Sequence, residues 1–151
     1  MVLTEKYELD TNDLSLVRFD MYVKTSEIVE IMLDKLTNEE ITLVKFLTLN
    51  LPFRSSMEDD DTYWDIIFVD YNVRMFLEHM LTKYNVKFKS KDITDLYYEK
   101  SETLDNKFIE EIDSFLDNKL DIDVILDKIN SLGIDRLKKY ELDFLNRQSI
   151  K

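Results

Sequence analysis

The only histidine of the chain, His79, stands next to Glu78 in a stretch whose apolar residues recur at helical spacing. A histidine that a carboxylate orients can act as a general base. A single histidine cannot, however, supply the paired imidazole ligands of the common zinc motifs. We therefore expect His79 to be a surface or half-buried side chain rather than a catalytic residue.

Four consecutive acidic residues, Glu58, Asp59, Asp60 and Asp61, could bind a hard cation or a basic partner protein. Calcium loops alternate their ligands along the chain and place a glycine at the sharp turn, and this run does neither. We therefore predict no metal site here and interpret residues 54–62 as an exposed, solvated loop.

Two aromatic residues follow the acidic run and begin an apolar, β-branched stretch that ends at Val69. Tryptophan and tyrosine are common at the energetic centres of protein interfaces. A core tryptophan in a buried strand is the more common arrangement, so both interpretations stay open. The candidate interaction residues are Glu58, Asp59, Asp60, Asp61, Tyr63 and Trp64.

A further group of side chains could form a carboxylate site with neighbouring tyrosines: Asp92, Asp95, Glu99, Tyr97 and Tyr98. No pattern in the sequence brings these groups together in space. We therefore predict no catalytic residue among them.

The chain lacks cysteine and contains one glycine and one proline. The lack of cysteine excludes disulfides, thiol nucleophiles, thiolate metal sites and iron–sulfur clusters. Phosphate-binding loops and nucleophile elbows need glycines at fixed spacings, so the common dinucleotide, nucleoside-triphosphate and hydrolase motifs are excluded as well. We therefore expect no cofactor and favour binding over catalysis.

The chain of 151 residues is strongly acidic, with 32 acidic residues, 20 basic residues and a net charge of -12. Phosphate contacts need clustered lysine and arginine, so this composition disfavours nucleic-acid or anionic-membrane binding and suits a basic protein partner. No apolar run approaches the ~18 residues of a membrane span, and the N-terminus lacks the pattern of a signal peptide. We expect a soluble, cytoplasmic protein.

The charge is unevenly distributed along the chain. Residues 1–120 carry 26 acidic and 14 basic residues, whereas residues 121–151 carry six of each. This contrast predicts a boundary near Lys119. We expect an acidic α+β body at residues 1–119 and a C-terminal helical hairpin at residues 120–151.

The N-terminal part is typical of a β-hairpin formed by residues 4–9 and 14–23. Apolar and polar residues alternate strictly in the second segment, which predicts a strand with one buried face. Residues 10–13 are Asp, Thr, Asn and Asp, which favour a turn because their side chains hydrogen-bond their own backbone.

From Ser26 the apolar residues recur every three and four positions, which predicts a helix. Thr37 and Glu40 have the spacing of a capping box, and they open a second helix that Pro52 ends. Beyond it, residues 93–98 fit either a helix or a strand. The other expected elements are a strand at 63–69, a helix at 72–84, a short strand at 86–89 and a helix at 104–116.

The last thirty residues predict two short amphipathic helices that meet at Gly133, where a left-handed residue typically ends a helix. Helices of roughly ten residues are marginal alone, so we expect this pair to pack on another part of the chain or on a partner. Asp121 or Asp123 can cap the first helix.

The string Ile125-Leu-Asp-Lys-Ile-Asn, followed by Gly133, Leu137, Glu141 and Phe144-Leu145, resembles a helical-hairpin module found at the C-termini of many bacterial proteins. The resemblance covers about a fifth of the chain. It implies a bacterial source and a packing or docking role without an active site.

The string departs from the usual module at two positions. Arg136 replaces a small polar residue, and Lys138 replaces the threonine that would form a capping box with Glu141. We propose Asp135 as the substitute N-cap of the second helix.

Residues 28–51 resemble the first two helices of a death-effector-type domain, but the strand-like segments at 14–23 and 63–69 argue against that all-helical fold.

The sequence therefore predicts an α+β fold with an N-terminal β-hairpin, one or two further short strands, five to six helices and a C-terminal helix pair. The leading functional hypothesis is a small bacterial protein that binds another protein as an immunity protein, inhibitor or regulator. A carboxylate-based enzyme and an acidic mimic of nucleic acid stay open as alternatives. The expected partner is a protein, with no direct contact to nucleic acid or membrane.

Overall fold

The computed structural model describes residues 9–150 and has the expected α+β class, with a C-terminal helix pair. It divides after Thr94 into two compact units, each described by itself below. Lys119, where the charge pattern predicts a boundary, lies inside the second unit at the end of a helix. Among the helices described, none is long and apolar enough to cross a membrane.

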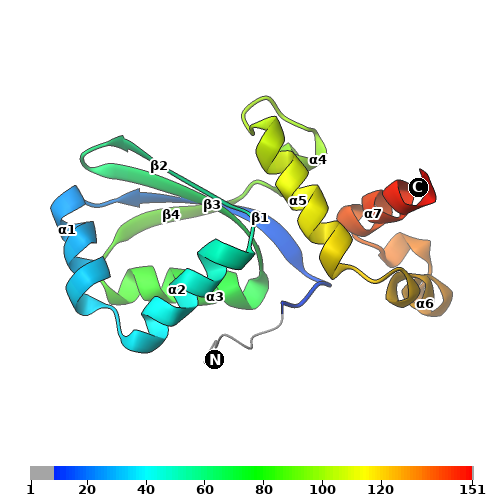
Figure 1. The fold of residues 1–151 in the computed structure, drawn as a ribbon, viewed down its shortest axis with the longest axis horizontal. Helices are drawn as coiled ribbons and strands as arrows, with labels where there is room; N and C mark the ends of the chain where they lie inside the picture. The colour runs from blue at the N-terminus through cyan, green and yellow to red at the C-terminus, as the bar shows by residue number, and fades with distance from the viewer. Residues whose placement is uncertain (1–8, 151) are drawn as a thin grey trace. The chain divides into compact units, whose positions relative to one another are not determined.

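The first unit is built on a four-stranded antiparallel sheet in the order β2-β3-β1-β4 (Figure 1). This β-α-β-β-α-β connectivity is that of the ferredoxin-like split unit. Helices α2 and α3 cover one face of the sheet. The elements are β1 (Leu14–Tyr22), α1 (Thr25–Glu30), a π-helical turn η1 (Ile31–Lys35), α2 (Asn38–Asn50), β2 (Phe53–Asp59), β3 (Thr62–Asp70), α3 (Tyr71–Lys83) and β4 (Lys87–Asp92).

Strand β1 lies in the middle of the sheet and confirms the alternation predicted for it. Its apolar side chains Val17, Phe19 and Met21 are buried, whereas those between them are partly or largely exposed. From Val17 to Tyr22 both edges of β1 are paired, with β3 on one side and β4 on the other. The segment 4–9, expected to form a hairpin with it, lies almost wholly outside the described residues.

The capping box at the start of α2 is confirmed. The Glu40 amide donates to the Thr37 hydroxyl oxygen at 3.1 Å, and the Thr37 amide donates to the Glu40 carboxylate at 2.9 Å. The preceding turn is wider than an α-helical one, because the Leu36 amide donates to the Ile31 carbonyl at 3.1 Å. Together these contacts fix where the helical segment bends between η1 and α2.

The expectation of a loop at residues 54–62 is wrong for most of its length. Phe53–Asp59 form strand β2, which pairs with β3, and only Asp60 and Asp61 make the turn between them. The segment is exposed, as expected. It is an edge strand whose side chains stay largely outside the core, so the apolar alternation that reveals a strand is missing.

The second unit is helical and comprises α4 (Thr94–Tyr98), α5 (Asn106–Lys119), α6 (Ile122–Leu132), the 3₁₀ turn η2 (Ile134–Arg136) and α7 (Lys139–Ile150). The ambiguous segment 93–98 is therefore mostly helix. Helix α5 buries Phe108, Ile112 and Leu116. Arg147 of α7 donates to Asp117 of α5 at 2.8 Å, so the C-terminal helix is tied to α5.

Gly133 lies at the turn between α6 and α7, as the sequence predicts, and it adopts a φ of +90°, which glycine accepts without steric cost. Asp135 does not cap α7 as proposed, because it lies in η2, before Lys138. The Lys138 amide instead donates to the Glu141 carboxylate at 2.8 Å. This bond is the glutamate half of a capping box, and it needs no threonine because a backbone amide supplies the donor.

Candidate functional site

A pocket of about 390 Å³ lies in the first unit, between the sheet and the helices that cover it. This volume falls in the range typical of small-molecule sites, roughly 300–1,000 Å³. Its walls are largely apolar, and they include Phe19 and Met21 of β1, Leu47 of α2 and Leu81 of α3. The pocket is therefore suited to an apolar occupant.

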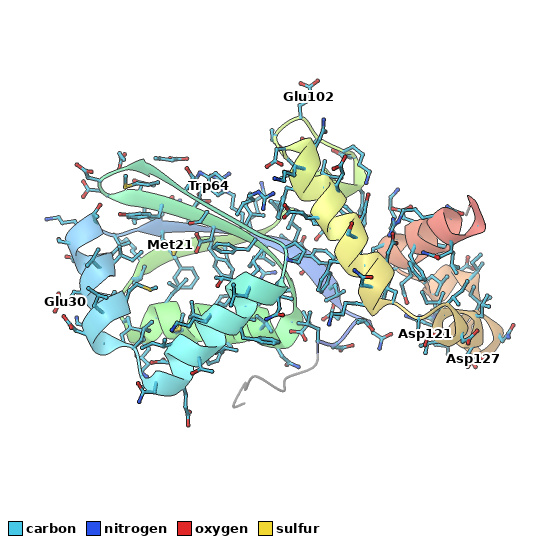
Figure 2. The ribbon with its side chains drawn as sticks, viewed as in Figure 1. Met21, Glu30, Trp64, Glu102, Asp121 and Asp127 are labelled. Atoms are coloured by element: carbon cyan, nitrogen blue, oxygen red, sulfur yellow. The ribbon has the colours of Figure 1, made fainter. Side chains whose placement is uncertain are left out.

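The pleat of the sheet decides which side chains reach the pocket. Successive residues of a strand point to opposite faces, so every second residue of β3 faces the helices. Tyr63, Asp65 and Ile67 are those residues, and all three line the pocket. Figure 2 shows Met21 of β1 on the side of the sheet that faces α2 and α3, and Trp64 of β3 on the opposite side.

Asp65 is the one acidic side chain among the described residues that line the pocket. It is half-buried and stands directly opposite Ser55 of β2 in the sheet register. Burial raises the pKa of the Asp65 carboxyl above its ordinary value, and a hydrogen bond with Ser55 opposes this only in part. A carboxyl whose pKa is raised by an apolar cavity is the kind of group found at functional sites.

The pocket wall at the end of α3 is fixed by a polar cluster around Glu40. The Tyr84 hydroxyl donates to the Glu40 carboxylate, and the Lys83 ammonium donates to its other oxygen at 3.2 Å. Burial raises the Glu40 pKa, but the hydrogen bonds from Tyr84, the Thr37 amide and Lys83 outweigh it and hold the pKa below its ordinary value. The cluster thus fixes the Tyr84 side chain, which lines the pocket.

A second tyrosine ties the pocket to α1. The Tyr63 hydroxyl donates to the Thr25 hydroxyl oxygen at 2.7 Å. The Thr25 amide in turn donates to the Asp60 carbonyl at 3.0 Å, so the β2–β3 turn is tied to the start of α1. Among the polar side chains of the wall, Tyr63 and Tyr84 are thus engaged with protein partners, whereas the hydrogen bond of Asp65 with Ser55 offsets the burial of its carboxyl only in part.

The six candidate interaction residues all lie on the β2–β3 hairpin, from Glu58 in β2 to Trp64 in β3. The pleat separates two of them, because Tyr63 lines the pocket and Trp64 faces the other side. The Arg18 guanidinium lies 5.2 Å from the centre of the Trp64 ring and 3.7 Å from the Glu58 carboxylate. The structure therefore gathers these residues on one hairpin but divides them between two faces.

The other sequence candidates do not form a site with the pocket. His79 is exposed on α3 and does not line the cavity. The Asp92 carboxylate accepts the Thr94 amide at 2.9 Å at the start of α4. Within residues 9–150 no cluster of histidine or acidic side chains could hold a metal ion.

Sequence reasoning missed Asp65. The signal available was a single acidic residue inside the apolar run from Tyr63 to Val69, at a position that shares its strand face with Ile67.

No protein-family model, no curated protein and no solved structure matches the chain. The resemblance of the C-terminal helices to a bacterial hairpin module therefore stays a prediction, and the site must be interpreted from its geometry.

Proposed function

We propose that this protein binds a small, largely apolar molecule in the pocket between the sheet and α1–α3, and that Asp65 holds the polar group of that molecule. The observation that carries this proposal is the position of Asp65, a half-buried carboxyl in a cavity of about 390 Å³ with apolar walls. A carboxyl in such a place is unfavourable unless a partner offsets its loss of water.

The expected polar group is an amine. An ammonium is both a hydrogen-bond donor and a cation, and a charge-assisted bond to a carboxylate is stronger than a neutral one. It would also favour the ionised form of Asp65 and so reverse the effect of burial on the Asp65 pKa. A carboxylate ligand would instead place two like charges in an apolar space.

Binding is favoured over catalysis because the described residues of the pocket wall offer Asp65 no second acid or base. General acid–base reactions use a second group that exchanges protons with the first or with the substrate. Apart from Asp65, the polar wall residues are hydroxyl-bearing, and Tyr63 and Tyr84 are held by Thr25 and Glu40.

The test compares three ligands of equal chain length: octylamine, octanol and octanoate. Each is titrated against the protein with an apolar fluorescent dye bound in the pocket, and displacement gives the affinity. We expect octylamine to bind tightest and octanoate weakest. In an Asp65→Asn variant the preference for the amine over the alcohol should fall by about tenfold, the factor that one lost charge-assisted bond of about 1.4 kcal/mol represents.

The matched control is Asp34→Asn, which removes the same charge at an exposed position of η1. It should leave the ranking of the three ligands unchanged. Equal affinity for amine and carboxylate, or the same ranking in the Asp65→Asn variant as in the parent, would refute the role proposed for Asp65.

A second candidate function is binding of a basic protein through the tip of the β2–β3 hairpin. The observation that favours it is the gathering of exposed carboxylates at this tip, where Asp59, Asp60 and Asp61 follow one another at the turn. A double Asp60→Asn, Asp61→Asn variant tests it. A protein captured from the native host by the parent chain should be lost with this variant, and unchanged capture would exclude the tip.

A further inference from the structure

The face of the sheet turned away from α2 and α3 carries a row of lysines along β4. Lys87, Lys89 and Lys91 occupy alternate positions of this strand, so they point to the same face, and all three are exposed. Alternate residues of a strand are about 7 Å apart. The row is therefore a line of three positive charges at regular spacing on a chain whose net charge is -12.

The register of the sheet places aromatic side chains beside this row. Tyr22 of β1 stands opposite Lys87 of β4, and Trp64 of β3 stands opposite Asp20, the neighbour of Lys89. Tyr22 is 43% exposed, and Trp64 is half-buried. The same face thus presents a line of charge at its edge and rings next to it.

The charges on this face are not balanced pair by pair. Arg18 is 3.0 Å from Asp20 and 3.7 Å from Glu58, so its charge is matched. Within the described part of the chain none of the three β4 lysines forms an ion pair. In the register Lys89 stands directly opposite Asp20, and Lys91 stands directly opposite Arg18. The three lysines carry more positive charge than Asp20, which is already paired with Arg18, can offset, so this edge of the face suits an anion.

We propose that this face binds a short segment of single-stranded nucleic acid. Phosphates of successive nucleotides lie along the three lysines of β4, and bases stack over Tyr22 and over the Trp64–Arg18 pair. This combination of a basic line with neighbouring rings and a guanidinium plane is how proteins bind single strands without reading sequence. The carboxylates of an acidic peptide would match the lysines but would not stack on the aromatic side chains.

The overall acidity of the chain limits the length of the segment. A nucleotide beyond the reach of the three lysines gains no phosphate contact with this row, and the net charge of -12 disfavours a longer polyanion. The contact is therefore confined to about three nucleotides. The salt dependence of its affinity should be that of three phosphate contacts. This site lies on the opposite face of the sheet from the pocket and does not depend on the function proposed for it.

The experiment measures the fluorescence anisotropy of labelled hexathymidylate with the full chain at several salt concentrations. We expect a plot of log affinity against log salt with a slope of about -2, from three phosphate contacts at about 0.7 each. Fluorescence of Trp64, the only tryptophan of the chain, should be quenched as the oligonucleotide binds.

The triple variant Lys87→Gln, Lys89→Gln, Lys91→Gln should bind at least tenfold more weakly, with a flatter salt dependence. Its matched control is Lys45→Gln, Lys107→Gln, Lys119→Gln, which removes the same charge from exposed positions on helices. This control should leave the affinity unchanged. A single Lys89→Gln variant, expected to weaken binding by a smaller factor, serves if the triple variant is less stable by circular dichroism.

Four outcomes overturn the proposal. In the first, hexathymidylate does not bind at low salt. In the second, the two triple variants lose the same amount of affinity for hexathymidylate. In the third, thymidine monophosphate competes as tightly as the oligonucleotide, which assigns the face to a free nucleotide. In the fourth, polyglutamate competes equally well, which shows that rings play no part.

Discussion

The ammonium of Lys128 in α6 lies 2.9 Å from the carboxylate of Glu141 in α7, whose side chain is only 3% exposed. The same carboxylate accepts the Lys138 amide at 2.8 Å. Glu141 therefore joins the two helices and begins the second one. A buried carboxylate is favourable here only because both donors reach it.

Replacing Lys128 with methionine should destabilise the protein by about 3 kcal/mol, because it leaves the Glu141 charge buried with one donor fewer. Urea unfolding followed by circular dichroism at a helix-sensitive wavelength measures the loss. The double variant Lys128→Met, Glu141→Gln should recover most of it, since the neutral amide still accepts from Lys138. If the double variant were as unstable as the single one, the loss would come from packing rather than charge.

The contribution of Asp65 to the stability of the first unit should fall as pH rises through the range in which Asp65 ionises. Because burial raises the Asp65 pKa above 3.8, the folded state binds more protons than the unfolded state between 3.8 and the raised value. The contribution of Asp65 to the free energy of unfolding therefore decreases across that range and levels off above it. The contribution of Glu40, whose pKa is lowered from 4.5, has the opposite sign, so the Asp65 contribution is measured as the difference between the parent and an Asp65→Asn variant. Urea midpoints at a series of pH values measure this slope.

An Asp65→Asn variant should lack that decrease and should be more stable than the parent at neutral pH, by about 1 kcal/mol. Well below pH 3.8 the two proteins should differ little, because the parent carboxyl is then largely protonated in both states. The exposed Asp34→Asn variant should keep the slope of the parent. If the stability of the Asp65→Asn variant depended on pH as that of the parent does, the decrease would come from another group.

Replacing Gly133 with alanine should cost about 1–2 kcal/mol through backbone strain alone. Its φ is +90°, which side chains disfavour, and a Cβ at this position would meet no atom of residues 9–150 within 4 Å. Thermal unfolding measures the loss. The control is Ser131→Ala, an exposed change in α6, which should be neutral or slightly stabilising because alanine favours helix.

Replacing Thr37 with alanine should cost about 1 kcal/mol, because the Glu40 amide at the start of α2 loses its acceptor. Unfolding by urea measures the loss. Thr82→Ala is the comparison, since the Thr82 hydroxyl donates only to the Glu78 carbonyl of its own helix. An equal loss in both variants would show that the capping bond contributes nothing of its own.

Structural elements that depend on a pattern among residues close in sequence were predictable. The spacing of Thr37 and Glu40 predicted a capping box, and the alternation around Phe19 predicted a strand, because each depends on neighbours within a few residues. Gly133 was predictable for the same reason. Strand β2 was not, since an edge strand with exposed side chains has the composition of a loop.

The candidate site could not be predicted, because it depends on segments that are distant in sequence. The environment of Asp65 is made by β1, α2 and α3, and only their packing creates the apolar cavity that raises its pKa. The lysines of β4 are visible as a repeat, but their place beside Tyr22 follows from the register. The negative net charge of the chain gave no indication of this local concentration of positive charge.

The wide turn η1 also bears on how this chain should be aligned with others. Its Ile31–Leu36 hydrogen bond encloses one residue more than the bond of an α-helical turn. Deleting one residue between them would restore an ordinary turn and leave β1 and α2 unchanged. A homologue without the wide turn should therefore show a single-residue gap at this point, and an alignment that forces equal length would misplace Ile28 and Ile31 in the pocket wall.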